Sequence, residues 1–364
     1  MPVKEEKKGL KMGKQLRWKQ PEYSKNKINK AGDIIRKNDV EDEDYSEAVK
    51  IVDNWRASHA YPLHVFYIHM RRMAENKKGI IVAERLKRLD SIIGKLSREE
   101  GMQLTRMQDL GGCRVILKNL NDVYRFRDIL SESRMRHELV REYDYIKNPK
   151  KSGYRSFHMV YKFHSDTPGK EIFNSNMLIE LQLRTHLQHV WATALETMGV
   201  YTNKDLKAGE GDSSVKRFFA IVSSLFALEE NCPVVENTSS ERTVLVNELK
   251  EICKNTKILD QLTAISVVIL NEKKIKNKIK NKDGYYILML NYEKKTLSLK
   301  KYMVSKIEEA REEYNIIESQ KNIKNIDAVL VRAGSIADVR KAYPNYFMDM
   351  SEFVKRIKKY IDET

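Results

Sequence analysis

A polar connection rich in cations, from residue 144 to residue 158, constrains the fold of this chain most. Strand-like sequence precedes and follows it, so the chain must reverse here between two strands of a sheet. Its chemically active side chains are Lys150, Lys151, Tyr154, Arg155 and His158, with Gly153 among them. Cations meet phosphate oxygens, a tyrosine ring offers a flat face to a nucleobase, and glycine lets the backbone approach a ligand closely. The connection therefore predicts a pocket for phosphate and base.

Strand and helix patterns on both sides of this connection predict the fold class. Strands are expected at residues 114–117, 138–145, 156–163 and 177–183, and helices at 123–130, 187–198 and 214–229. Two earlier helices, one from about residue 43 and one after Pro62, carry apolar side chains on one face and are expected to cover the sheet. The pattern predicts an α+β fold, a mixed β-sheet flanked by helices.

The length of 364 residues exceeds one comfortable core and predicts two domains. Residues 1–40 hold twelve Lys or Arg and five Asp or Glu with few aliphatic residues, so we expect a basic flexible arm. Residues 41–230 are expected to form the larger domain, 231–270 a linker and connecting helix, and 271–364 a smaller C-terminal α/β domain. Within these C-terminal parts we expect a helix at 248–270, a lysine-rich loop at 273–282, strands at 285–292, 296–302 and 328–331, and helices at 305–319, 335–342 and 351–360.

Charge and cysteine content narrow the class of partner and the compartment. The chain has 67 Lys and Arg against 51 Asp and Glu, a formal charge of +16, which favours a polyanionic partner such as nucleic acid or a nucleotide. The three cysteines have no metal-ligand or disulfide spacing and suit a reducing interior. No apolar window is long enough to cross a bilayer, so we expect a cytoplasmic protein without membrane contact.

Two carboxylates extend the predicted pocket. Asp109 precedes the apolar strand at residues 113–117, and Glu180 lies within the strand pattern at 177–183. Carboxylates at strand ends beside a cationic loop suit a triphosphate carrying Mg²⁺. Taken alone, Asp109 could cap a helix and Glu180 could form a salt bridge at a strand edge.

A cationic segment upstream adds a third element. The sequence from residue 80 to residue 96 begins as a strand and turns helical, so we expect Lys87, Ser91 and Lys95 to share one helix face. Four motifs then occur in order along the chain. They are Arg85-x-Lys87-x-x-x-Ser91-x-x-x-Lys95, Asp109 with Arg114, the segment 144–158, and Glu180-x-Gln182-x-Arg184-Thr185.

These motifs resemble the RelA/SpoT-type synthetase domain over about residues 43–230, without a hydrolase domain ahead of it. The resemblance implies that Arg85 packs on the adenine of ATP, while Lys87, Ser91, Lys95 and Arg114 complete the ATP site. It assigns catalysis and Mg²⁺ to Asp109 and Glu180, with Glu180 the second metal ligand or the general base. It assigns the acceptor side to Lys150, Tyr154, His158, Gln182 and Arg184.

The implied reaction is in-line attack of a 3′-hydroxyl on the β-phosphorus of ATP, which releases AMP and leaves pyrophosphate on the acceptor. The pocket alone does not choose the acceptor, because a guanine nucleotide and the 3′-terminal adenosine of tRNA could both stack on Tyr154. The alternatives are a tRNA-modifying toxin, a small alarmone synthetase acting on GTP or GDP, and an inactive RNA-binding or phage-sensing protein. Intact Asp109 and Glu180 disfavour the last.

The C-terminal sequence Tyr343-Pro344-Asn345-Tyr346 resembles the YxxY element of antitoxins that neutralise toxic small alarmone synthetases. Over nearly its whole length the chain resembles the CapRel-type fused toxin–antitoxin proteins of anti-phage defence. That resemblance implies a tRNA acceptor, a block of translation, and autoinhibition by Tyr343 and Tyr346 through an intramolecular toxin–antitoxin contact. It also implies release by a phage protein, the major capsid protein. Four residues taken alone would favour an ordinary packed turn.

Overall fold

The computed structural model describes residues 18–37, 39, 43–75, 77, 79–202, 206, 211–269, 283–291, 296–319, 326–347 and 350–363. Its centre is an eight-stranded mixed sheet of order β3-β4-β5-β2-β1-β8-β6-β7, in which β2 and β5 are parallel and the other neighbours antiparallel. The strands are β1 (Ile81–Leu86), β2 (Gly111–Leu117), β3 (Glu138–Asp144), β4 (Phe157–Lys162), β5 (Leu178–Thr185), β6 (Gly284–Asn291), β7 (Thr296–Tyr302) and β8 (Ile326–Ala333). The predicted fold class is confirmed.

Helices α1–α5 bury one face of the sheet. They are α1 (Lys25–Arg36), α2 (Tyr45–Ser58), α3 (Ala60–Ala74), α4 (Leu89–Arg98) and α5 (Leu120–Glu132). Alternate strand side chains such as Val82, Val115 and Met159 join them in one apolar core. The opposite face is therefore left for polar side chains and for later segments of the chain.

The expected flexible arm over residues 1–40 is wrong for residues 25–36. These form α1, whose N-cap Ser24 accepts a hydrogen bond from the Lys27 N–H. Ile28 and Ile35 of α1 are almost fully buried in the core beneath the sheet. The prediction relied on the high charge of this segment. Its few aliphatic residues nevertheless recur at helical spacing, and they suffice to pack α1 against the core. Residues 1–17 lie outside the described residues.

The C-terminal strands extend the same sheet instead of forming one of their own. β8 pairs antiparallel with β1, with Arg85 opposite Val331, and β6 continues the sheet beyond β8. Tyr285 donates to Glu84 Oε1 (3.1 Å) across this junction. A domain boundary before residue 271 therefore does not correspond to a break in the sheet.

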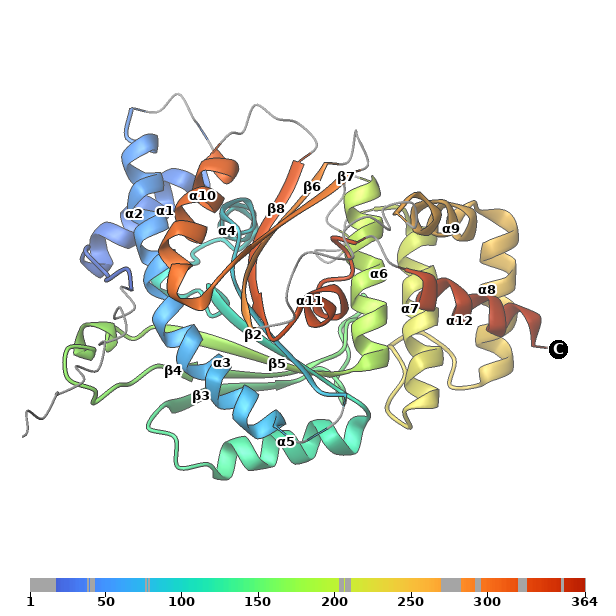
Figure 1. Cartoon of the computed structure of the whole chain (residues 1–364). Coiled ribbons are helices and arrows are strands. Elements are labelled where there is room, and N and C mark those ends of the chain that lie inside the picture. Colours follow the sequence, from blue (N-terminus) through green and yellow to red (C-terminus); the bar gives the residue numbers. More distant parts are fainter. Residues whose placement is uncertain are drawn as a thin grey trace, which may run out of the picture.

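Most of the remaining helices form one cluster, and two others each lie alone on a face of the sheet. The cluster holds α6 (His186–Thr202), α7 (Ser213–Glu229), α8 (Arg242–Asn255), α9 (Ile258–Ile269) and α12 (Ser351–Asp362). Figure 1 shows α7, α8, α9 and α12 at one side of the molecule, with α6 between them and the sheet. The expected single helix at 248–270 is two helices, because the chain bends at Thr256 and Lys257. The lysine-rich run at 273–282 lies outside the described residues.

Helices α10 (Ile307–Ser319) and α11 (Ile336–Ala342) cover opposite faces of the C-terminal strands. Helix α10 lies beside α2, where Arg56 Nη1 donates to Glu318 Oε2 (2.6 Å). Helix α11 lies on the polar face, between the sheet and α6 (Figure 1). No helix in the described part of the chain is both long and apolar enough to cross a membrane.

Candidate active site

Strand register gathers the motif side chains on the face of the sheet that α1–α5 leave open. Residues directly opposite each other on neighbouring strands point to the same face. One row across β1, β2, β5, β4 and β3 is Arg85, Gly112, Glu180, Val160 and Arg141, and the next is Ala83, Arg114, Gln182, His158 and Tyr143. Motifs distant in sequence therefore meet at the middle of the sheet.

Asp109 lies just before β2, between two lysines. Lys87 Nζ is 2.6 Å from Asp109 Oδ2, and Lys95 Nζ is 3.1 Å from Asp109 Oδ1. Burial alone would raise the pKa of Asp109, but the two ammonium groups hold it well below its ordinary value. The carboxylate is therefore ionised at neutral pH and available to a cation.

The structure partly corrects the prediction that Lys87, Ser91 and Lys95 share one helix face. The strand continues through Leu86, so Lys87 lies in the connection to α4 and not on the helix. Ser91 and Lys95 do lie on α4, one turn apart and half-buried. Lys87 and Lys95 still converge because Asp109 draws both ammonium groups to one point.

Buried guanidinium groups make this region strongly positive. Arg114 is almost fully buried, and burial together with the neighbouring Arg184 lowers the pKa of Arg114 to about 10. Among the described residues, Arg114 Nε and Arg184 Nε have no hydrogen-bond partner. Buried cations with unused donors are a site suited to an anion with several oxygens, such as a polyphosphate.

A small cavity joins these groups. Its lining side chains are Arg85, Lys87, Asp109, Gly112, Cys113, Arg114, Glu180, Gln182 and Tyr343. Its volume is about 30 Å³. Sites for small-molecule ligands usually measure about 300–1,000 Å³. Tyr343 forms one wall, so the arrangement described here leaves no room for a nucleotide.

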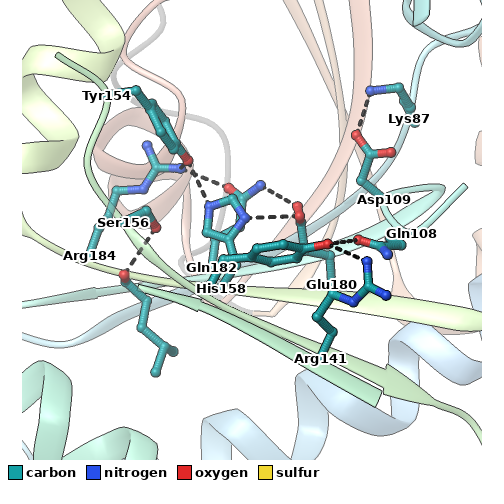
Figure 2. A network of polar contacts seen from close by, with 12 residues as sticks. Lys87, Gln108, Asp109, Arg141, Tyr154, Ser156, His158, Glu180, Gln182 and Arg184 are labelled. Atoms are coloured by element: carbon teal, nitrogen blue, oxygen red, sulfur yellow. Dashed lines mark hydrogen bonds and ion pairs between the residues drawn. The ribbon is translucent and has the colours of Figure 1, made fainter. Parts of the chain in front are cut away.

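Glu180 belongs to a ring of hydrogen bonds on the acceptor side. His158 Nδ1 lies 2.9 Å from Glu180 Oε1, and His158 Nε2 lies 2.9 Å from the Tyr154 hydroxyl. Gln182 donates to Glu180 Oε2 (2.6 Å), and Arg184 Nη2 donates to Gln182 Oε1 (2.7 Å). Figure 2 shows this network facing the Lys87–Asp109 pair. The predicted acceptor residues Tyr154, His158, Gln182 and Arg184 are thus brought together.

The network fixes the charge states of its members. Burial would lower the pKa of His158, but Tyr154 and Glu180 together raise it to about 9. Burial would raise the pKa of Glu180, but the His158 imidazolium lowers it. At neutral pH, His158 is therefore protonated on both nitrogens and Glu180 is ionised.

A titration tests this ion pair in the protein without nucleotide or Mg²⁺. Since the pKa of His158 is higher in the folded chain than its ordinary 6.5, the pair stabilises the fold below pH 6.5, and this stabilisation is lost as pH rises through about 9. We expect Glu180→Gln to lower the pKa of His158 to near or below 6.5, because burial then opposes its charge. NMR titration of the His158 ring measures this. A pKa that stays near 9 in the variant would refute the pairing.

Lys150 lies between two rings of the cationic connection. Its Nζ is 4.6 Å from the ring centroid of Tyr145 and 5.6 Å from that of Tyr154. It thus borders the hydrogen-bonded ring at the Tyr154 end.

The sequence led us to expect that Gly153 lets a ligand approach the backbone closely. In the structure, close packing against neighbouring helices accounts for this glycine. Gly153 has φ of +93°, and an added Cβ would lie 2.8 Å from Ser223 Cβ and 2.9 Å from Trp191 Cζ2. Its carbonyl oxygen accepts a hydrogen bond from the Ser223 hydroxyl (2.6 Å). Glycine is required here because the connection packs so closely against α6 and α7 that no Cβ fits.

We expect Gly153→Ala to lower the free energy of unfolding by about 2–4 kcal/mol, from the left-handed backbone and the steric overlap together. Gly169→Ala is the matched control, because Gly169 also has positive φ (+76°) but nothing within 4 Å of the added Cβ. The control should lose only about 1–2 kcal/mol. Urea unfolding of both variants measures the difference, and equal losses would contradict the packing argument.

Tyr343 and Tyr346 follow α11 and are both almost fully buried on the open face of the sheet. The Arg114 guanidinium carbon lies 5.4 Å from the Tyr343 ring centroid. The Tyr346 hydroxyl donates to Asp327 Oδ1 (3.2 Å) and accepts from Arg88 Nη1 (3.3 Å). Tyr343 therefore lines the cationic side of the cavity, whereas Tyr346 is held by Arg88 and Asp327.

Arg114 of β2 and His189 of α6 hold the end of α11. Arg114 Nη1 donates to the carbonyl oxygen of Ala342 (2.8 Å), and His189 Nε2 donates to that of Lys341 (2.7 Å). Carbonyls at a helix C-terminus lack partners within the helix, and a cation there also meets the negative end of the helix dipole. The sequence analysis missed His189, since no motif spacing marks it and only its position one turn into α6 brings it here.

The carboxylates suit a metal that a substrate helps to bind. The described residues contain no group of three or more His, Cys, Asp or Glu side chains that could hold a metal by themselves. Asp109 and Glu180 nevertheless line the same cavity. Mg²⁺ typically takes one or two carboxylates together with phosphate oxygens, so these two residues fit it in the presence of a triphosphate.

Part of the chain is similar to known proteins. The family described as "Region found in RelA / SpoT proteins" matches residues 84–205. GTP pyrophosphokinase YjbM of Bacillus subtilis (strain 168) is 32% identical over 114 residues, which are 31% of this chain and 52% of that protein. GTP pyrophosphokinase YwaC of the same organism is 28% identical over 148 residues, 38% of this chain and 64% of that protein. The chain therefore spans about half of one relative and less than two thirds of the other.

Solved structures of the same group are also similar. Small alarmone synthetase 1 of Bacillus subtilis, bound to its product pppGpp, has 22% identity and a TM-score of 0.43, covering 49% of this chain and 92% of that chain. A GTP pyrophosphokinase family protein from Streptococcus pneumoniae has 26% identity and a TM-score of 0.39, covering 47% and 85%.

The open face of the sheet thus carries a cation-lined site with paired carboxylates. Residues 84–205 match the family of regions found in RelA / SpoT proteins, and part of the chain is similar to two GTP pyrophosphokinases.

Proposed function

We propose that this protein is a pyrophosphokinase that transfers pyrophosphate from ATP to the 3′-hydroxyl at the 3′ end of tRNA and so blocks translation. The observation that carries the proposal is the convergence of three of the four motifs on one cavity, with Asp109 and Glu180 among its lining residues. The remaining motif, the segment 144–158, reaches this cavity through the contact of His158 with Glu180. The family match over residues 84–205 supports the reaction class.

On the donor side, the cationic groups around Asp109 receive the triphosphate. Lys87 and Lys95 now neutralise Asp109, and phosphate oxygens would compete for the same ammonium groups. Arg114 offers an unused N–H to an anion, and Arg85 lines the cavity beside it, where its planar guanidinium can stack on adenine. Mg²⁺ held by Asp109 and Glu180 would neutralise charge on the transferred group.

On the acceptor side, Tyr154 supplies a flat face for the base and Glu180 an ionised carboxylate for the attacking hydroxyl. The 3′-hydroxyl forms a bond to the β-phosphorus as the bond from that phosphorus to the AMP oxygen breaks, and AMP leaves. The hydroxyl proton passes to Glu180 as general base. His158, protonated and hydrogen-bonded to both Tyr154 and Glu180, fixes their relative positions.

Two observations bear on the acceptor. The formal charge of +16 and the exposed Lys147, Lys150 and Lys151 of the connection that carries Tyr154 favour a polyanion such as tRNA. The curated relatives are GTP pyrophosphokinases, which favours the second candidate, a small alarmone synthetase acting on GTP or GDP. The two candidates share the donor chemistry and differ only in the acceptor.

We also propose that the C-terminal region inhibits the synthetase region in cis. Tyr343 walls a cavity of about 30 Å³, too small for ATP, and its ring lies against Arg114. The hydrogen bonds from Arg114 and His189 to the end of α11 favour this closed arrangement. Activation would then require α11 and the two tyrosines to leave the sheet.

The trigger for release, in this proposal, is a phage protein, the major capsid protein, that binds the C-terminal region and stabilises the open state. Support for this comes from the CapRel-type resemblance. Co-expression of the chain with a phage major capsid protein should slow growth, while co-expression of the capsid protein with an Asp109→Asn chain should not. Normal growth in the first case, with both proteins present, counts against this trigger.

Incubation with γ-labelled ATP tests the reaction and its acceptor. The full-length chain and its Tyr343→Ala variant are each given bulk tRNA, GTP or GDP. A point variant is preferable to truncation near Asn231, because truncation removes β8, which pairs with β1. Label in tRNA supports the first candidate, label in guanine nucleotide supports the second, and label in neither refutes both.

A further inference from the structure

Two tyrosines near the exposed edge of the sheet form a stack to which no role has been assigned above. The ring centroids of Tyr143 and Tyr145 are 5.6 Å apart, with planes only 4° from parallel. The guanidinium carbon of Arg141 is 5.9 Å from the Tyr143 centroid, and Lys150 Nζ is 4.6 Å from that of Tyr145. Both tyrosines are half-buried and both cations are exposed. We name these four residues the Tyr143–Tyr145 platform.

The platform borders the acceptor side of the site. Tyr143 lies opposite His158 in the β3–β4 register, and its hydroxyl donates to Gln108 Oε1 (3.3 Å), next to Asp109. Tyr145 meets Tyr154 edge to face, with centroids 6.1 Å apart. Figure 2 shows Arg141 and Gln108 on the same side of Glu180. The platform thus continues directly from the Tyr154 end of the hydrogen-bonded ring.

The C-terminal region covers the same face of the sheet as the platform, but over β1 and β8 and not at the β3 edge. Helix α11 packs against β1 and β8, whereas the platform belongs to β3 and the connection after it, at the edge of the sheet. The closed arrangement therefore covers the donor side and leaves the platform accessible.

The chemistry of the platform suits an unpaired nucleotide. Proteins that bind single strands present aromatic rings to successive bases and cations to the backbone, and the bases stack whatever their sequence. A mononucleotide acceptor has one base, which Tyr154 serves, so it has no second base for the platform. Lys150 lies between the Tyr145 and Tyr154 rings, where the phosphate that links two consecutive nucleotides would require a cation.

We propose that the Tyr143–Tyr145 platform binds the base that precedes the acceptor nucleotide in a single-stranded RNA 3′ end. The inference rests on the proposed function in one respect, namely that the Tyr154 side receives the acceptor nucleotide. It makes Tyr143 a determinant of acceptor class, since only a nucleic-acid acceptor gains from it.

Binding to the full-length chain tests this without any need for activation. Calorimetry compares a single-stranded RNA trinucleotide with a free 3′-hydroxyl and the matching single nucleotide, at one fixed salt concentration. Stacking of one base contributes about 1–3 kcal/mol, so Tyr143→Leu should reduce the gain from the additional nucleotides by roughly 5- to 150-fold. Tyr143→Phe keeps the ring but loses the hydroxyl contacts to Gln108 and Arg141, and should retain the gain.

The binding results separate failure of the platform from failure of the tRNA acceptor. A gain in the wild type that persists in Tyr143→Leu overturns the inference alone and makes the stack a cover for the strand edge. If the wild type binds the trinucleotide no better than the single nucleotide, the inference fails. If it also binds GTP or GDP in preference to RNA, the tRNA acceptor fails with it.

Discussion

Replacing Tyr343 by alanine is expected to activate the protein. The ring is almost fully buried against Arg114 and walls the small cavity, so its loss opens the donor side and weakens the closed state at once. Truncating a buried aromatic side chain usually costs about 3–5 kcal/mol. If half of this is confined to the closed state, the open fraction rises by roughly 10- to 70-fold. Transfer of label from γ-labelled ATP, and slowed growth on expression, measure the effect.

Three variants show whether the effect is specific. Tyr343→Phe keeps the ring in the cavity wall and should stay inactive. Phe353→Ala removes an equally buried ring from the helix cluster around α12, away from the cavity, and should not activate. Adding Asp109→Asn to Tyr343→Ala should restore growth. An inactive Tyr343→Ala protein, present at wild-type level, would contradict autoinhibition.

The second large effect is expected from Glu180→Gln in the activated Tyr343→Ala chain. The amide cannot accept a proton from the attacking hydroxyl, and it also removes the charge that keeps His158 protonated. Loss of a general base typically lowers the rate by about 10²–10⁴-fold. The rate of pyrophosphate transfer at saturating ATP and acceptor measures it.

An acid outside the cavity provides the control. Glu171 is exposed, in a short turn between β4 and β5, and Glu171→Gln should leave the rate unchanged. A Glu180→Gln chain that folds normally and keeps most of the rate would assign the proton to another group and leave Glu180 a positioning role.

Local patterns in the sequence were sufficient for the elements of the fold and for much of the site. Alternating and helical periodicities gave β3, β4, α7 and α10 within a few residues, because the spacing of apolar side chains depends only on the local backbone. The motif order also named Asp109, Glu180 and Tyr154, which the structure brings to one face. Errors arose where local signals misled, as with α1, whose charge hid an apolar stripe, and Gly153, which packs against α6 and α7.

The sequence by itself determined which side chains could bind a polyphosphate, because side-chain chemistry and spacing along a strand or helix are local properties. Only the tertiary structure decided how these groups meet. The pairing of β8 with β1, the contact of Arg114 with Ala342 and Tyr343, and the alignment of Arg114 with Gln182 all join segments far apart in the chain. Such contacts depend on strand register and on the burial of whole faces, for which a linear pattern carries no signal.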